Sequence, residues 1–161
     1  KQHLQNNKLQ FYSEPSLDQL KVVEIDFEGK PFVLRNDTAE AWLKMKIDAE
    51  KENVKLHPFS GFRSYLYQKR LIEYHLKNGR SLEDILTEFA IPGFSEHHTG
   101  CAIDIHAVGK PVLEEAFEFT DEFQWLVKNA ARYGFKLSYP RENNVGIIYE
   151  PWHWFFYGGN E

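Results

Sequence analysis

Short apolar runs at the start of the chain are followed by longer segments with helical spacing. Residues 1–20 are polar, match neither the helix nor the strand pattern, and are expected to wrap the surface. An apolar run from Val22 to Phe27 and a second from Phe32 to Leu34 flank Glu28-Gly29-Lys30. Two such runs around a short glycine-containing segment predict a β-hairpin.

Four segments combine apolar residues at helical spacing with a residue suited to cap a helix N-terminus. Asp37 followed by Glu40 matches a capping box, and the helix that it opens carries Trp42, Met45 and Ala49 on one face. The other helices are expected to begin at Ser64, Ser81 and Thr120, and to end near Asn78, before Pro92 and at Gly134.

The remaining apolar segments have strand character. They are Val54 to Pro58, Cys101 to Val108, Phe135 to Tyr139 and Gly146 to Phe156. Helices and strands are interspersed, with hairpin-like pairs late in the chain, which favours an α+β fold with a small, mainly antiparallel sheet flanked by helices. A length of 161 residues suits one domain. We expect residues 1–36 to form an N-terminal wrap and hairpin and residues 37–161 to form the motif-bearing core.

Composition narrows the class of partner. Acidic residues number 24 against 19 basic ones, a formal net charge of −5, which argues against nucleic acid because phosphate binding needs a basic face. Apolar runs stay below the roughly 18 residues of a transmembrane helix. Cys101 is the single cysteine, so an intramolecular disulfide is excluded, but the compartment stays open. Aromatic residues make up 16% of the chain and could form a core or line a substrate groove.

Two segments place metal-binding residue types together. In Ser95 to Asp104 a histidine, His97, lies in a turn and an acid lies on the strand that follows. In Glu150-Pro151-Trp152-His153 an acid precedes a histidine by three positions. Two histidines and one carboxylate form a common catalytic zinc shell that leaves one position for water. His97, Asp104 and His153 are therefore candidate ligands of one Zn²⁺ ion.

A metal site for hydrolysis also needs a carboxylate that moves a proton between water and the leaving amine. Glu150 is the candidate. Glu150 and His153 are three positions apart, so their side chains would face opposite sides of a regular strand. The proposed role of Glu150 therefore requires an irregularity in the strand, which Pro151 makes plausible. The alternative is a capped strand end with a pair of aromatic core residues.

Arg63 and Gln68 are candidate partners of a substrate. Arg63 lies where a strand turns into the second helix, and an arginine fixed there can hold a carboxylate or stabilise a developing oxyanion. Its alternative role is a surface charge, although the helix dipole mildly disfavours a cation at that end. Gln68, one turn later, could donate a hydrogen bond to substrate or face solvent.

Two more histidines lie close to the candidate ligands. His106 is two positions after Asp104 and therefore faces the same way, so it could act as a ligand or support one. His98 adjoins His97 and is expected to point elsewhere.

These segments together resemble the VanY-like D-alanyl-D-alanine and L,D-carboxypeptidases, zinc peptidases related to the hedgehog domain. The pattern Ser-x-His-x-x-Gly-x-Ala-x-Asp matches Ser95 to Asp104, Glu-Pro-Trp-His matches Glu150 to His153, and Ser-Gly-aromatic-Arg-Ser matches Ser60 to Ser64, with Gln68 at the expected distance. The three motifs span residues 60 to 154 in the order of the family.

The resemblance implies a role for each matched residue. His97, Asp104 and His153 bind zinc, Glu150 acts as general base and then general acid, and Arg63 stabilises charge near the scissile carbonyl. Ser95, Gln68 and Trp152 contact the substrate, the first two around its terminal D-alanine. The implied substrate is a peptidoglycan stem peptide that loses its C-terminal D-alanine in the bacterial cell envelope.

Several questions stay open at this point. D,D- and L,D-specificity differ in the chirality of one residue, which the sequence does not decide. An endopeptidase that cleaves cross-links and a non-catalytic zinc module are the alternatives. Retention of Glu150 and Arg63 argues against the second, because a structural site has no use for an unliganded base. The oligomeric state is not predicted.

Overall fold

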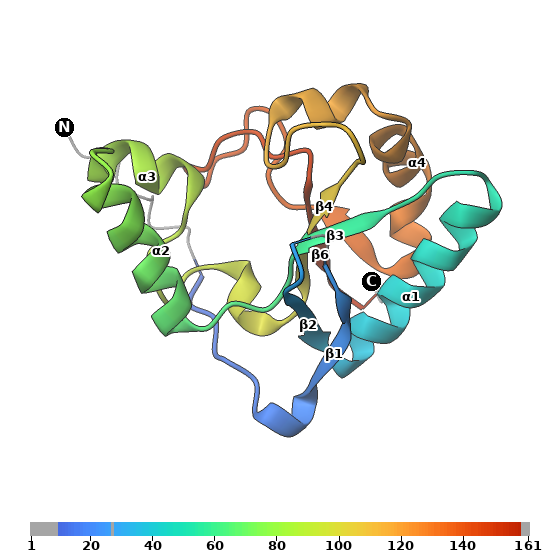
Figure 1. Ribbon diagram of the computed structural model, residues 1–161, viewed down its shortest axis with the longest axis horizontal. Coiled ribbons are helices and arrows are strands. Elements are labelled where there is room, and N and C mark those ends of the chain that lie inside the picture. The colour runs from blue at the N-terminus through green and yellow to red at the C-terminus, as the bar shows by residue number, and fades with distance from the viewer. Residues whose placement is uncertain (1–9, 27, 159–161) are drawn as a thin grey trace.

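A four-stranded antiparallel sheet forms the centre of the computed structural model, which describes residues 10–26 and 28–158 (Figure 1). Its strands run in the order β3 (His57–Ser60), β4 (Ala102–His106), β6 (His153–Phe156) and β5 (Phe135–Leu137). A separate antiparallel hairpin joins β1 (Leu20–Ile25) to β2 (Pro31–Arg35). The hairpin and the α+β class agree with the sequence prediction.

In the part of the chain that the structure describes, four α-helices and several 3₁₀ helices surround the sheet. The α-helices are α1 (Asn36–Lys51), α2 (Tyr65–Lys77), α3 (Leu82–Glu88) and α4 (Asp121–Asn129). The 3₁₀ helices are η1 (Leu17–Gln19), η2 (Glu96–Thr99), η3 (Glu115–Phe119) and η4 (Ala130–Tyr133). Among the described residues, none of the helices is both long and apolar enough to cross a membrane.

Three helices begin at the caps that the sequence predicts. The hydroxyl oxygens of Ser64, Ser81 and Thr120 each accept a hydrogen bond from the backbone three residues later, which satisfies an otherwise unpaired N–H. The first helix differs. It begins at Asn36 after Arg35, and Asp37 lies inside its first turn, where its carboxylate pairs with the Arg35 guanidinium. The predicted Asp37–Glu40 capping box is therefore wrong.

All four strands of the sheet are shorter than predicted, and two of them differ most in their starting points. The strand predicted over Val54 to Pro58 begins only at His57, and Val54 instead closes the end of α1 through its backbone N–H. Of the strand predicted from Gly146, only His153–Phe156 pairs in the sheet. Irregular backbone before His153 proves to shape the site. Phe27 and residues 1–9 lie outside the described residues.

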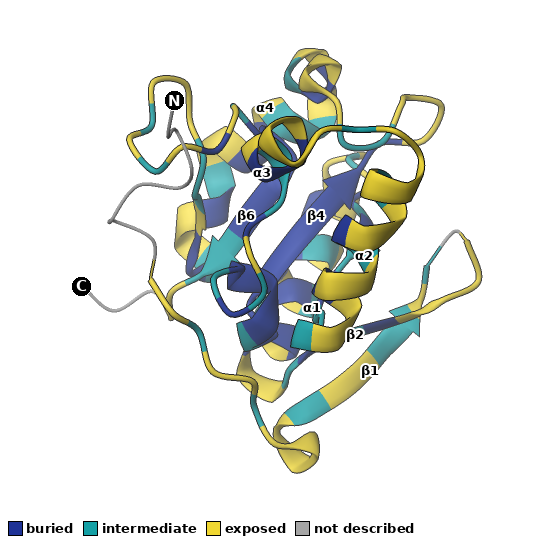
Figure 2. Ribbon diagram, turned by 90° about the vertical axis from the view of Figure 1, so that its left-hand side faces the viewer, coloured by how far each residue is buried: buried dark blue, intermediate teal, exposed yellow. Residues whose placement is uncertain are grey.

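The two faces of the sheet have different surroundings. Ile103 and Trp154 belong to a buried cluster with Trp42 and Met45 of α1 and Leu126 of α4. Figure 1 shows α1 and α4 on this side of the sheet and α2 and α3 on the other. In Figure 2, β4 is buried along its length, whereas α2 presents exposed residues. The core therefore lies between the sheet and α1/α4.

Strand β2 of the hairpin forms backbone hydrogen bonds with two of the three motif-bearing segments. The Phe62 N–H donates to the Val33 carbonyl at 2.8 Å, and the Arg35 N–H donates to the Gly100 carbonyl at 2.8 Å. A Cβ atom at Gly61 would lie 2.5 Å from the Val33 oxygen, a contact that only glycine avoids. The hairpin therefore holds the loops before α2 and after η2 in place.

Candidate metal centre and active site

Asp104 and His153 are direct neighbours on adjacent strands. The register of β4 and β6 pairs Asp104 with His153 and Ile103 with Trp154. Because side chains alternate between faces, Ile103 and Trp154 pack into the core while Asp104 and His153 face the α2/α3 side. The sheet thus presents a carboxylate and an imidazole from distant parts of the chain to the same point.

The third donor, His97, completes a buried group of three. His97 Nε2 lies 3.3 Å from Asp104 Oδ1, and His153 Nδ1 lies 3.2 Å from the same oxygen. Ligand atoms of these three residues all lie within 4.8 Å of one another. Each side chain is buried, and His97 Nε2 and Asp104 Oδ1 lack a hydrogen-bond partner. Buried polar atoms without partners that converge on one point indicate a cation site.

The spacing and donor types fit zinc. Tetrahedral Zn²⁺ with ligand distances of roughly 2.0–2.1 Å separates neighbouring ligand atoms by about 3.3 Å. The two Asp104–histidine distances, 3.3 and 3.2 Å, match that edge. Two imidazoles and one carboxylate also leave a fourth position open, as in catalytic sites.

Local structure fixes His97. Gly100 with φ 73° ends η2, and the Ser95 hydroxyl oxygen caps it by accepting the His97 N–H. On the ring, Nδ1 lies 2.7 Å from the Gly61 carbonyl oxygen and must donate to it, which leaves the Nε2 lone pair for a metal. Burial lowers the pKa of His97 to about 4, so the imidazole stays neutral, as a ligand must.

His153 carries a partner that the sequence did not reveal. Its Nε2 lies 2.8 Å from Oε1 of Glu96, a buried carboxylate on η2. Burial alone lowers the pKa of His153, but the carboxylates of Asp104 and Glu96 outweigh it and raise that pKa to about 10. A cation entering the site therefore displaces a proton from His153.

Glu150 lies beside this group because the chain turns before β6. The His153 N–H donates to the Glu150 carbonyl at 3.2 Å, so residues 150–153 form a turn rather than extended strand. The required irregularity is present, and it brings Glu150 Oε2 to 3.6 Å from His153 Nδ1. Burial raises the pKa of the Glu150 carboxyl to about 8 in the metal-free site. A carboxyl with such a pKa can exchange protons near neutral pH.

Arg63 and Gln68 form a connected pair at the same point. Arg63 Nη1 donates to Gln68 Oε1 at 3.1 Å, and Arg63 Nη2 lies 3.8 Å from Asp104 Oδ2. Gln68 is buried, and its amide nitrogen donates to the Ala90 carbonyl. Gln68 therefore positions the guanidinium, while its predicted direct contact with substrate stays a prediction.

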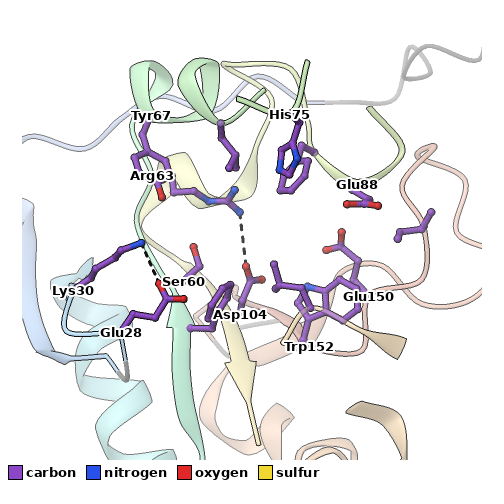
Figure 3. A pocket seen from close by; sticks show the side chains of 15 residues that line it. Glu28, Lys30, Ser60, Arg63, Tyr67, His75, Glu88, Asp104, Glu150 and Trp152 are labelled. Atoms are coloured by element: carbon purple, nitrogen blue, oxygen red, sulfur yellow. Dashed lines mark ion pairs between the residues drawn. The ribbon is translucent and has the colours of Figure 1, made fainter. Parts of the chain in front are cut away.

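A cleft with a volume of about 350 Å³ opens over Asp104 and Glu150 (Figure 3). Arg63 reaches into it from one side and Trp152 forms part of its floor, as Figure 3 shows. Lys30 from the hairpin, Tyr67 and His75 from α2, and Glu88 from α3 also line the cleft. Sequence reasoning missed Lys30 and Glu88 because nothing in the linear order relates the hairpin or α3 to the motifs, and it gave Tyr67 and His75 of α2 no role.

A second, smaller cavity of about 20 Å³ lies beside the donors. Its lining includes Gln68, Ala90, Ser95, Tyr139 and Ile147, together with Glu150 and His153. Ser95 and Gln68 thus line the same pocket and Trp152 lines the larger cleft, while their predicted contacts with substrate stay predictions. Tyr139, whose ring centroid lies 4.7 Å from that of His153, carried no sequence signal.

Neither His98 nor His106 belongs to the metal group among the described residues. His98 Nδ1 donates to the Arg63 carbonyl at 2.7 Å and its Nε2 accepts the Gly93 N–H, so it ties η2 to the Arg63 loop. His106 shares the strand face of Asp104 but pairs with His57 across the β3–β4 register, further along the sheet.

The geometry defines a candidate metal site with an unliganded carboxylate beside it, and comparison with known proteins places the chain in a family. The sequence matches the VanY D-alanyl-D-alanine carboxypeptidase family profile over residues 31–159. This chain belongs to that family, which confirms the resemblance carried by the three motifs.

Individual relatives agree with this assignment. The putative carboxypeptidase YodJ of Bacillus subtilis is 39% identical over 147 residues, which cover 87% of this chain and 53% of the relative. The chain thus spans about half the length of that curated relative. The LdcB LD-carboxypeptidase structure superposes with a TM-score of 0.79 at 32% identity, covering 91% of this chain and 71% of that one. VanYB in complex with D-alanine-D-alanine gives a TM-score of 0.67 at 26% identity, covering 84% and 76%.

Proposed function

We propose that this chain is a zinc-dependent carboxypeptidase that removes the C-terminal D-alanine from peptidoglycan stem peptides. One observation carries the proposal. Three buried donors, His97, Asp104 and His153, converge from two distant segments, and the unliganded carboxylate of Glu150 lies 3.6 Å from one of them. A structural zinc site would use four protein ligands and need no such carboxylate, so the arrangement favours catalysis over a non-catalytic module.

Zinc would be held by His97 Nε2, Asp104 Oδ1 and His153 Nδ1. When bound, the ion supplies a Lewis acid that polarises a carbonyl oxygen and makes water more acidic. Glu150 takes a proton from the attacking water as the water oxygen adds to the scissile carbonyl carbon. The same carboxyl then returns that proton to the amine nitrogen as the C–N bond breaks.

Arg63 supplies the positive charge opposite Glu150. Its guanidinium is largely buried and is held by Gln68 Oε1, so it needs little reorganisation during the reaction. Fixed donors aimed at a developing oxyanion lower the barrier more than mobile ones. We assign Arg63 to the charge that develops on the carbonyl oxygen or to the substrate carboxylate beside it.

The small cavity supports removal of a small terminal residue. A volume of about 20 Å³ holds a group of roughly the size of one water or methyl. Ser95 and Gln68 line it and would contact the terminal D-alanine. An endopeptidase needs room on both sides of the scissile bond, so the small volume of this cavity favours the carboxypeptidase over the cross-link endopeptidase. The similar VanYB structure, which holds D-alanine-D-alanine, supports the same substrate class.

The direct test is incubation with muramyl tetrapeptide and muramyl pentapeptide, with and without a chelator, followed by mass spectrometry. We expect chelator-sensitive loss of one D-alanine. Loss from the tetrapeptide alone assigns L,D-specificity, and loss from the pentapeptide alone assigns D,D-specificity. Intact substrates in the presence of zinc would refute the proposal, and cleavage of cross-linked dimers alone would replace it with the endopeptidase. With either substrate, the site of action would be the bacterial cell envelope.

A further inference from the structure

The hydrogen bond between His153 and Glu96 has a consequence for how the metal is held. Glu96 is the first residue of η2, next to the ligand His97, yet its carboxylate lies on the far side of the His153 ring from Asp104. It contacts His153 Nε2 at 2.8 Å, whereas Nδ1 of the same ring faces Asp104 Oδ1 at 3.2 Å. Glu96 is therefore no member of the three-donor group.

Two carboxylates thus compete for the protons of one imidazole. A neutral imidazole carries a single N–H, and the nitrogen that keeps it cannot bind a metal. Asp104 Oδ1 would draw the proton to Nδ1, which blocks the cation. Glu96 Oε1, at the shorter distance, holds it on Nε2 and leaves the Nδ1 lone pair directed at the site.

The other histidine ligand solves the same problem differently. His97 Nδ1 donates to the Gly61 backbone carbonyl at 2.7 Å, so His97 faces the site through Nε2. The two imidazoles therefore present different nitrogens, and only His153 depends on a side chain for its orientation. Partners of this kind generally tune metal affinity by fixing the ring and its tautomer.

Burial maintains the Glu96 contact. Glu96 is 8% exposed, and a cavity on its outer side is lined by Tyr12, Phe94, Ser138 and Tyr139. The backbone N–H of Tyr12 donates to the Gly93 carbonyl at 2.8 Å, which fixes the Tyr12 segment beside this cavity. The small exposed fraction of Glu96 favours the pairing of its carboxylate with the ring over hydration.

We propose that Glu96 is a positioning residue that holds the His153 proton on Nε2 and thereby commits Nδ1 to the metal. The inference rests on the proposed metal site. It assigns Glu96 no contact with substrate, so its effect appears first in metal affinity.

The test compares two variants of nearly equal length. Glu96→Met removes the acceptor and keeps most of the volume, whereas Glu96→Gln keeps an acceptor oxygen. Zinc affinity is measured by competition with a chromophoric chelator, and the cobalt(II) absorption spectrum reports the coordination. We expect Glu96→Met to bind zinc about 10- to 100-fold more weakly, with an altered cobalt spectrum, and Glu96→Gln to lose less.

Glu52→Met is the matched control, because Glu52 accepts a hydrogen bond from another ring N–H, that of Trp125, away from the site. Its zinc affinity should equal that of the parent protein. Glu96→Met binding zinc as tightly as the parent would overturn the inference, and so would an equal loss in Glu52→Met. Failure of the parent itself to bind zinc would instead refute the proposed function.

Discussion

Individual side chains around Glu150 illustrate how a buried acid gains a chemical role. Few groups in a protein interior stay charged without partners, and burial keeps the Glu150 proton at a pH where exposed carboxyls have lost it. Its neighbours are His153, a proposed metal ligand, and, across the site, the guanidinium of Arg63. A general base that takes up and releases a proton during the reaction needs a pKa near the working pH.

Glu150→Gln should abolish turnover and leave zinc content unchanged, because an amide cannot carry the proton and Glu150 is not a ligand. We expect a fall in kcat of at least about 10²- to 10⁴-fold. Stopped assays of D-alanine release, with zinc measured in the same samples, check this. Glu142→Gln, at an exposed position, serves as the control. Full activity in the Gln variant would mean that another group is the base.

Arg63→Ala should lower kcat/KM by about 10²- to 10³-fold, since it removes the fixed donor that we assign to the charge on the substrate. Zinc content should not change, because Arg63 contacts Asp104 Oδ2 rather than the metal-facing Oδ1. Arg70→Ala, an exposed arginine of α2, should retain the parent rate. An unaltered rate in Arg63→Ala would place that residue outside the site.

At the scale of elements, the site depends on strand β2, which no motif includes. Hydrogen bonds from Phe62 to β2 and from β2 to Gly100 hold the two loops that position His97. The Gly61 carbonyl, directed by this contact, fixes the His97 ring. The hairpin is therefore part of the support of the metal centre.

Gly61→Ala tests this support. The added Cβ would meet the Val33 oxygen at 2.5 Å and the Phe32 ring at 2.8 Å, so β2 or the loop must move. Overpacking of this kind costs about 1–3 kcal/mol in the free energy of unfolding. Denaturant titration of the metal-free protein measures it, and zinc affinity should fall as well. An unchanged midpoint would show that β2 yields without strain.

Local signals explain which elements the sequence predicts well. Ser64, Ser81 and Thr120 cap their helices because capping depends only on residues within one turn. The capping-box prediction at Asp37 was wrong because the guanidinium of Arg35, at the end of β2, pairs with the Asp37 carboxylate. Pro151 signalled the local turn at Glu150, whereas the late start of β3 escapes hydrophobic periodicity.

The same distinction applies to the site. Motif spacing identified His97, Asp104, His153 and Glu150, which the fold brings together. Glu96 was visible in the motif but had no assigned role, because its partner His153 lies 57 positions away. Lys30 and Glu88 enter the cleft only through the arrangement of whole elements.

At the scale of the molecule, the buried site makes stability depend on pH. The pKa of Glu150 rises from an ordinary 4.5 to about 8 in the folded metal-free protein. Between these values the unfolded chain has released a proton that the folded protein retains, so rising pH destabilises the fold. The contribution of the protonated Glu150 carboxyl to stability is complete below about pH 4.5 and is lost as the pH rises through about 8.

The Glu150→Gln variant has no titratable group at this position. We therefore expect its Tm to rise relative to the Tm of the parent protein as the pH increases from about 4.5 to about 8. Thermal unfolding of both proteins in chelator, at several pH values, measures the difference. A difference that is constant with pH would contradict the assignment of the raised pKa to Glu150.

The central claim is that a single zinc ion binds between His97, Asp104 and His153. Anomalous diffraction at the zinc edge, from crystals grown with zinc, tests it most directly. We predict one peak at roughly 2.0–2.2 Å from His97 Nε2, Asp104 Oδ1 and His153 Nδ1. A strong peak at other residues, or no peak between these three atoms, would contradict the account.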